Sequence, residues 1–292
     1  RPDELKAIAG PTDGEALALL LGVTQAGNFE HSSSILTWRT SFDAVAQQTG
    51  RRPDEIAEVW RRWRPSLYEA RGRRIWPGLD KKIVTSWNGL ALEALALGYA
   101  ATGDARYLKA AEDTEALLWS THRRDDGGLY RASNHGQPLE IGVLDDYAFF
   151  AVGLLRLFEV TGDLKTLSRC QALVKEARSR FTREGGGYYF AEASDLSLIL
   201  RPFDTYDAVR PSGNSAMFEA ELRLGALIGD PSLSASVETA LNNYGRLSLR
   251  SGLNMAGWHR AALNLLGPFY ELIIAGDPSD KTTQSLEATY AR

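Results

Sequence analysis

Two aspartates stand where a pair of carboxylates could act as general acid and general base. Asp146 begins a predicted apolar helix. Asp207 lies four residues before Pro211, in the segment that leads into another predicted apolar helix. Paired carboxylates of this kind cleave glycosidic bonds. The partial positive charge at a helix N-terminus favours an ionised Asp146 as the base, and the less polar neighbours of Asp207 favour a raised pKa and an acid role. We predict that both are catalytic; helix capping is the alternative for Asp146.

Polar and aromatic side chains occupy equivalent positions at the starts of predicted helices. A tryptophan at a cavity rim, such as Trp87, can stack on a sugar ring, although buried packing explains it equally well. Residues 212–215 match neither a nucleophile elbow nor a phosphate loop. The alternative to a ligand-binding role for them is an N-cap that permits close helix packing. The residues that we predict to bind a substrate are Trp87, Asn88, Asp145, Asn214, Ser212, Tyr189, Tyr130 and Asp80.

The histidines and the cysteine do not predict a metal site. No histidine begins a predicted apolar helix, and no two have the i, i+4 spacing of a metal-binding pair. The four are His31, His122, His135 and His259. Cys170 is the only cysteine, so the chain offers no second thiol for a disulfide or a thiolate site. We expect no metal and no cofactor.

The helices that must position these residues belong to a repeat. Three short Gly-Asp turns have glycines 59 and 67 residues apart. The helix before each turn is apolar nearly all round, which predicts a buried inner helix, and the helix after it is amphipathic, which predicts an outer helix. The turns are Thr102-Gly103-Asp104, Thr161-Gly162-Asp163 and Ile228-Gly229-Asp230, and the predicted inner helices span 88–101, 146–160 and 215–228.

The connections that return from an outer helix to the next inner helix are long, spanning roughly 121–144 and 182–211. Long connections in a compact domain usually carry function. They all fall at the end where the inner helices begin, while the short turns fall at the other end. We call the end at which residues 88, 146 and 215 begin the inner helices the mouth, and we predict the site there.

The composition excludes several classes of function. The chain has 292 residues, of which 44% are hydrophobic and 24% charged, as in an ordinary globular protein. A net charge of −4 without basic blocks offers no surface for nucleic-acid phosphates. No apolar run approaches the roughly 20 residues that span a bilayer, and residues 1–4 lack the features of a secretory signal. We expect a soluble, cytoplasmic protein that binds neither nucleic acid nor membrane.

Four motifs carry a family resemblance. They are Gly27-Asn28-Phe29-Glu30, Ile83-Val84-Thr85-Ser86-Trp87-Asn88-Gly89-Leu90, Leu144-Asp145-Asp146-Tyr147-Ala148-Phe149 and Pro211-Ser212-Gly213-Asn214-Ser215. Together they resemble the thioredoxin-domain-containing proteins related to spermatogenesis-associated protein 20. The chain departs from that family's pattern at Lys81, where an acidic residue is usual, and at His31 and Ala208, where glycine is common.

The resemblance implies an all-α fold, an (α/α)6 toroid like that of six-hairpin glycosidases, preceded in the family by a thioredoxin-like domain. We expect this chain to hold the toroid only in part, over residues 1–265, with a C-terminal strand and helix over 266–292, the strand at 269–277. Three hairpins with flanking helices do not complete a ring, so we expect the remaining N-terminal part of the same protein as a partner.

We therefore expect a toroid that binds or processes a glycan with carboxylates at the mouth, as a glycoside hydrolase or a sugar epimerase does. A small saccharide is the expected ligand. An epimerase completed by further hairpins stays open, since this chain offers no histidine pair. The other alternative is a non-catalytic scaffold or protein-interaction module attached to a thioredoxin-like domain.

Overall fold

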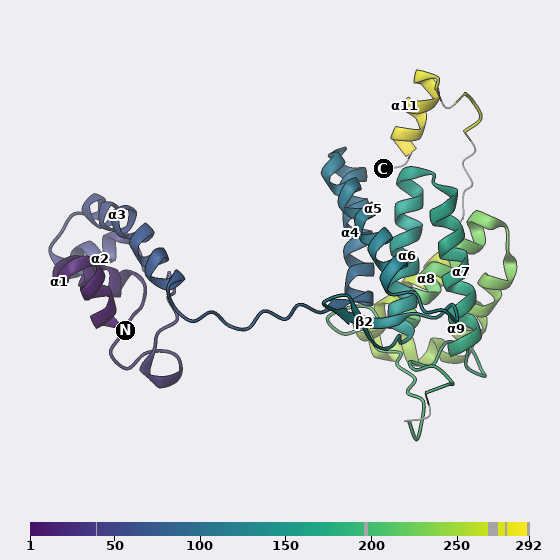
Figure 1. Ribbon diagram of the computed structural model, residues 1–292, viewed down its shortest axis with the longest axis horizontal. Helices are drawn as coiled ribbons and strands as arrows, with labels where there is room; N and C mark the ends of the chain where they lie inside the picture. The colour runs from purple at the N-terminus through teal and green to yellow at the C-terminus, as the bar shows by residue number, and fades with distance from the viewer. Residues whose placement is uncertain (39, 196–197, 268–273, 278, 291–292) are drawn as a thin grey trace. The chain divides into compact units, whose positions relative to one another are not determined.

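Helices dominate the computed structural model, which describes residues 1–38, 40–195, 198–267, 274–277 and 279–290 (Figure 1). Contacts divide the chain into two compact units, Arg1–Asp80 and Lys81–Arg292. The predicted division between residues 265 and 266 stays a prediction.

The first unit is a small helical bundle. It consists of α1 (Pro2–Leu20), the 3-10 turn η1 (Glu30–Ser32), α2 (Phe42–Thr49) and α3 (Pro53–Gly72). The Ser41 hydroxyl caps α2, and Pro53 begins α3, where its missing N–H costs no helical hydrogen bond. The core lies between the three helices and includes Leu17, Leu20, Val45, Ile56 and Val59.

The second unit contains three successive helical hairpins and one further helix that packs with them. The hairpins are α4 (Thr85–Thr102) with α5 (Ala105–Thr121), α6 (Leu144–Thr161) with α7 (Leu164–Phe181), and α8 (Gly213–Ile228) with α9 (Pro231–Ser251). The 3-10 turn η2 (Gly252–Met255) and α10 (Ala256–Leu266) follow, and then α11 (Lys281–Tyr290). The sequence patterns predicted the hairpins and the last helix but not α10.

The three Gly-Asp turns are confirmed as equivalent. Gly103, Gly162 and Gly229 adopt φ angles of 68°, 68° and 67°, the left-handed conformation that glycine takes without strain. The aspartate after each glycine caps the next helix: backbone N–H groups of Arg106, Lys165 and Ser232 donate to Asp104, Asp163 and Asp230 over 2.9 to 3.0 Å.

The first helix of each hairpin belongs to an inner layer, and the second helix belongs to an outer layer. α6 packs between α4 and α8, and α8 in turn packs against α10, so α10 is a fourth inner helix. Every residue from Leu144 to Leu155 of α6 is buried, as predicted for an inner helix. The expectation of burial all round over residues 88–101 was wrong for α4, whose Leu97 is 43% exposed. Figure 1 shows α4 to α7 standing side by side.

α4 and α6 approach closely at two glycines. A Cβ atom on Gly89 would lie 2.6 Å from the backbone carbon of Phe149, and one on Gly153 would lie 2.7 Å from the Gly89 carbonyl oxygen. A larger residue at either position would push the two backbones apart. The carboxylates of Asp146 and Asp207 each bond to the start of a neighbouring inner helix, α4 and α10 respectively. The start of α8 lies against Asp145 at the start of α6, which confirms that the inner helices begin at one common end.

A small antiparallel sheet covers part of that end. Its strands are β1 (Ile83–Val84), β2 (Tyr130–Asn134) and β3 (Gln137–Ile141), in that order. Val84 pairs with Ala132, so the residue before α4 is tied to the first return connection. The strand predicted at 269–277 falls mostly outside the described residues. In the part of the chain that the structure describes, no helix has the length and apolar character needed to cross a membrane.

Candidate functional site

Asp146 links the starts of two inner helices. Its Oδ1 accepts a hydrogen bond of 2.9 Å from the backbone N–H of Ser86 in α4, and its Oδ2 accepts one of 2.9 Å from the N–H of Val143 before α6. The side chain is fully buried. Both oxygens therefore satisfy backbone donors that a helix N-terminus leaves without partners, and the capping interpretation accounts for this aspartate.

Burial opposes the effect that we expected the helix N-terminus to have on Asp146. We expected the helix dipole and the unpaired N–H groups to hold this carboxylate ionised. Loss of hydration raises its pKa from 3.8 to about 6, and the hydrogen bonds from Ser86 and Val143 only partly oppose that shift. The helix N-terminus was the right position, but complete burial outweighs its field.

Asp207 links the next pair of inner helices. Its Oδ1 accepts from the backbone N–H of Ser212 over 2.8 Å and from the hydroxyl of Ser215 over 2.7 Å. Its Oδ2 accepts from the N–H of Gly257 at the start of α10, over 2.7 Å. Asp207 thus ties α8 to α10, as Asp146 ties α6 to α4. Among the described contacts none joins the two carboxylates, and the predicted acid and base pair stays a prediction.

Asp145 points to the other neighbour of α6. Its side chain forms an ion pair of 2.5 Å with Arg210, in the connection that precedes α8. A Cβ on Gly213 would lie 2.4 Å from its Oδ1, so only glycine lets α8 begin this close to the carboxylate. Burial raises the pKa of Asp145, and the Arg210 guanidinium opposes the shift. Adjacent residues on a helix point in different directions, and here each reaches a different neighbour.

Arg210 is a site residue that the sequence patterns did not reveal. Its side chain is 38% exposed, and its guanidinium lies 5.5 Å from the centre of the Phe149 ring. A guanidinium has five N–H donors, and that of Arg210 uses one of them in its bond to Asp145. Arg210 therefore keeps donors for a ligand while Asp145, only 5% exposed, holds it in place.

The aromatic residues predicted for the site differ in their surroundings. Trp87 lies in the first turn of α4, one residue after Ser86, and is 66% exposed. Tyr130 is half-buried in β2. Tyr189 is half-buried with the Arg201 guanidinium 4.3 Å from its ring centre. Of the three, Trp87 presents the most surface to a ligand.

The amide of Asn214 is used within the protein. Its Oδ1 accepts from the Tyr188 N–H over 2.8 Å, and its Nδ2 donates to the carbonyls of Tyr188 and Asp204 over 3.0 and 2.8 Å. Ser212 caps α8 by accepting from the Ser215 N–H, as the N-cap alternative predicted. Both residues therefore hold the connection before α8, and their predicted ligand contacts stay predictions.

Two other predicted ligand residues are placed differently. Asn88 donates from Nδ2 to the Val84 carbonyl over 2.8 Å, which stabilises the start of α4. Asp80 is the last residue of the first unit. Its role at the mouth stays a prediction.

The return connections share a structure that the repeat did not reveal. Arg124 and Arg183 each donate from the backbone N–H to a glycine carbonyl four residues later, over 2.9 and 3.0 Å. The backbone N–H groups of Tyr130 and Tyr189 each donate to the carbonyl of the residue eight positions earlier, over 2.8 Å. These pairs are 59 residues apart, so the repeat of the first two hairpins extends into the connections that follow their outer helices.

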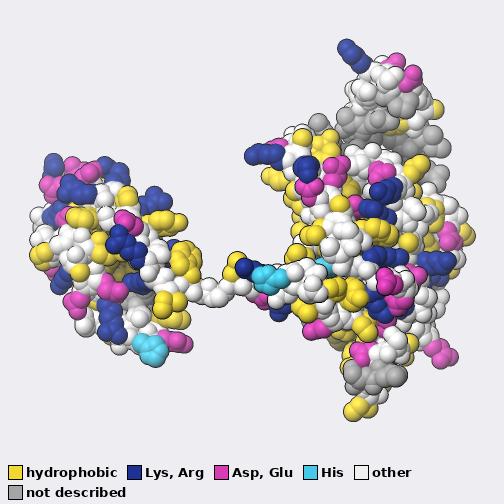
Figure 2. Space-filling view, in the orientation of Figure 1, with side chains coloured by type: hydrophobic (Ala, Val, Ile, Leu, Met, Phe, Trp, Pro, Cys, Tyr) yellow, Lys and Arg dark blue, Asp and Glu magenta, His cyan; other side chains and the backbone are white. Residues whose placement is uncertain are grey.

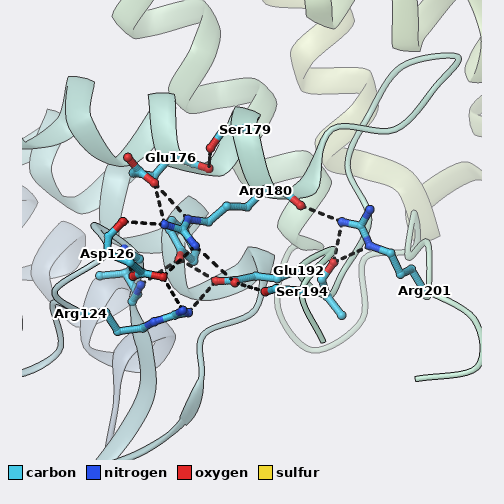
Figure 3. Close-up of polar contacts among 12 residues, drawn as sticks. Arg124, Asp126, Glu176, Ser179, Arg180, Glu192, Ser194 and Arg201 are labelled. Atoms are coloured by element: carbon cyan, nitrogen blue, oxygen red, sulfur yellow. Dashed lines mark hydrogen bonds and ion pairs between the residues drawn. The ribbon is translucent and has the colours of Figure 1, made fainter. Parts of the chain in front are cut away.

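An ionic cluster holds these connections to α6 and α7 (Figure 3). Arg124 pairs with Asp126 over 2.6 Å and with Glu192 over 2.9 Å, and Arg180 reaches the same two carboxylates over 3.3 and 3.4 Å. Glu192 is nearly inaccessible and also accepts from the Tyr147 hydroxyl over 3.1 Å. A buried carboxylate with this many donors fixes the loops around the mouth.

His122 forms a buried chain of hydrogen bonds beneath the sheet. The Thr85 hydroxyl donates to the Tyr130 carbonyl over 2.6 Å, so it accepts from His122 Nδ1, which lies 2.6 Å away. His122 Nε2 lies 2.9 Å from the Ser133 hydroxyl. Burial lowers the pKa of His122, so the ring is neutral at physiological pH. Within the described ranges, no three His, Cys, Asp or Glu side chains cluster as metal ligands would.

Comparison with known proteins confirms the resemblance found in the motifs. The human spermatogenesis-associated protein 20 is 28% identical over 296 residues, which cover 94% of this chain. The chain is similar to this protein along most of its length. It spans only 38% of the human protein's length. An uncharacterized protein of Caenorhabditis elegans is 32% identical over 179 residues, which is 59% of this chain and 23% of that protein. No model of a known protein family matches the chain.

A solved structure confirms the fold. The GH76 α-mannanase of Bacteroides thetaiotaomicron superposes on 73% of this chain and 57% of its own, with a TM-score of 0.52 and 15% identity. The expected fold class, a mostly helical α/α toroid of the kind found in carbohydrate-processing enzymes, is therefore correct.

Proposed function

We propose that the second unit binds a saccharide at the mouth, the end where α4, α6, α8 and α10 begin. One observation carries the proposal: an exposed tryptophan, Trp87, and a partly exposed guanidinium, Arg210, begin or precede inner helices of a toroid fold that a glycan-cleaving enzyme shares. A sugar ring combines an apolar face with hydroxyl groups. An indole face can stack on the first, and guanidinium N–H groups can donate to the second.

Binding rather than cleavage is the function that the carboxylates support. Asp146 and Asp207 use their oxygens to accept from backbone N–H groups at helix starts. A general acid or base must instead lie within hydrogen-bond reach of the reacting atoms. Asp145 is the remaining carboxylate of this group, and its ion pair with Arg210 suits it to orient the guanidinium.

Calorimetric titration of the full-length protein with a panel of monosaccharides and oligosaccharides, mannan fragments included, tests the proposal. We expect a saturable interaction that weakens about tenfold or more in Trp87→Ala, since a stacked aromatic contributes on the order of 1 kcal/mol beyond its buried area. Trp76→Ala is the matched control, because Trp76 is 63% exposed but belongs to the first unit. Absence of binding across the panel, or equal losses in both variants, contradicts the proposal.

A non-catalytic scaffold is the second candidate function. It is favoured by exposed apolar side chains on the inner helices, including Trp87 and Leu97 of α4 and Leu263 of α10. Exposed apolar groups of this kind are typical of surfaces that contact another protein segment. In that case Trp87→Ala leaves saccharide titrations unchanged and weakens association with the rest of the full-length protein.

A further inference from the structure

The first unit contains a pocket of about 760 Å³ that is independent of the mouth. Its walls are matching stripes of two helices: Glu4, Leu5 and Ile8 from α1, and Leu67, Ala70 and Arg71 from α3. Residues three and four positions apart share one face of a helix. The pocket volume lies within the range of sites that enclose small organic ligands.

The base of the pocket is apolar. Leu5 and Val23 are buried at 6% exposure, and Leu67 is half-buried beside them. Trp76 stands at the rim with 63% of its surface exposed, and its indole N–H is used by the Gly72 carbonyl, 3.1 Å away. The apolar part of a ligand can therefore contact both the aliphatic base of the pocket and the Trp76 ring.

The rim carries an excess of positive charge. Arg74 pairs with Glu4 over 2.7 Å, so that carboxylate is already neutralised. Arg71 lies 5.9 Å from the centre of the Trp76 ring, and no carboxylate partner is recorded for it in the described ranges. Hydrophobic and basic side chains stand close together on the surface of this unit (Figure 2). Charge complementarity thus calls for an anionic group on the ligand.

Ser34 lines the pocket as well. Its Oγ is buried and makes no hydrogen bond to any residue that the structure describes.

We propose that this pocket binds a small carboxylate with an apolar body. Arg71 donates to the carboxylate in the bidentate geometry that guanidinium and carboxylate favour. The apolar body lies on Leu5, Val23 and Leu67 under the edge of Trp76. Arg1 also lines the pocket and donates to the His31 carbonyl over 2.6 Å, and Arg74 pairs with Glu4, so Arg71 is the arginine placed to receive the carboxylate. The apolar base disfavours highly polar polyanions.

Titration of the full chain with decanoate, below its micelle concentration, tests this site, and decanol is the uncharged comparison. We expect decanoate to bind saturably, to shift the indole N–H resonance of Trp76, and to bind at least about tenfold more tightly than decanol. Arg71→Gln should weaken decanoate binding about tenfold and leave decanol unaffected.

Arg64→Gln is the matched control. Arg64 also lies on α3 and over a tryptophan, 6.0 Å from the centre of the Trp60 ring, but it does not line the pocket. The Arg64→Gln variant should bind decanoate as tightly as the unmodified chain does. The inference is overturned if decanoate and decanol bind equally, if neither binds, if Trp76 does not respond, or if Arg64→Gln and Arg71→Gln lose the same affinity.

Discussion

Replacing Asp207 by asparagine separates a structural role from a catalytic one. The carboxylate accepts three hydrogen bonds, from the N–H of Ser212, the hydroxyl of Ser215 and the N–H of Gly257. An asparagine has one acceptor oxygen, so at best it keeps the two bonds to Oδ1 and turns an NH2 group toward the Gly257 donor. We expect the contact between α8 and α10 to loosen.

The magnitude follows from these three bonds. The lost bond to a charged acceptor contributes about 1.5–3 kcal/mol, and the two that remain fall to roughly half their strength when the charge is removed. Because Asp207 is half-buried, water offsets part of this loss. We expect about 3 kcal/mol of destabilisation, which lowers the midpoint of thermal unfolding by about 6–12 °C in a unit of this size.

Circular dichroism melts measure the midpoint, and amide hydrogen exchange of Gly257 reports the local contact. Asp204→Asn is the matched control, because Asp204 is exposed and its side chain accepts only from the Tyr206 N–H, over 3.1 Å, among the hydrogen bonds described. Its midpoint should change by less than about 2 °C. The reasoning is refuted if Asp207→Asn melts like the unmodified protein, and loss of saccharide turnover in that stable variant would restore the catalytic interpretation.

Three further outcomes follow from the packing and from buried groups. Gly89→Ala should lower the unfolding free energy by about 1–3 kcal/mol in denaturant titrations, because its Cβ meets the Phe149 backbone, whereas Gly98→Ala, facing a movable ring on the same helix, should be neutral or stabilising. Burial raises the pKa of Glu221 from 4.5 to about 7, so the folded state binds this proton more tightly than the unfolded state does. In urea titrations, the unfolding free energy of the unmodified protein relative to that of Glu221→Gln should fall as the pH rises from 4.5 to 7. A difference that does not change with pH would contradict this prediction. Burial raises the pKa of Cys170 to about 12, so a thiol reagent should label it only on unfolding.

The hairpins could be predicted because their signals are local. A glycine in the left-handed conformation followed by a capping aspartate marks each turn within three residues, as at Gly103 and Gly162. α10 was missed because no such turn precedes it; it follows the 3-10 turn that ends at Met255. Burial of α4 was overestimated because the sequence shows how apolar a helix is but not how many neighbours it has.

The positions of the candidate residues could be predicted from the sequence, but their contacts could not. Asp145 and Asp146 lie at a helix start, as predicted, and point in different directions. Their partners are remote, since Ser86 and Arg210 lie 60 and 65 positions away from them. The repeat identifies equivalent positions on different hairpins but does not show which of their side chains meet, so capping across helices could not be distinguished from acid and base chemistry.

The most direct test of the central claim, a saccharide site at the mouth, is the indole N–H resonance of Trp87 during titration of the full-length protein with mannan oligosaccharides. We predict a saturable shift that Arg210→Gln weakens, with the resonance of Trp76 unchanged. No movement of the Trp87 signal while an oligosaccharide binds, or no binding at all, would contradict the claim.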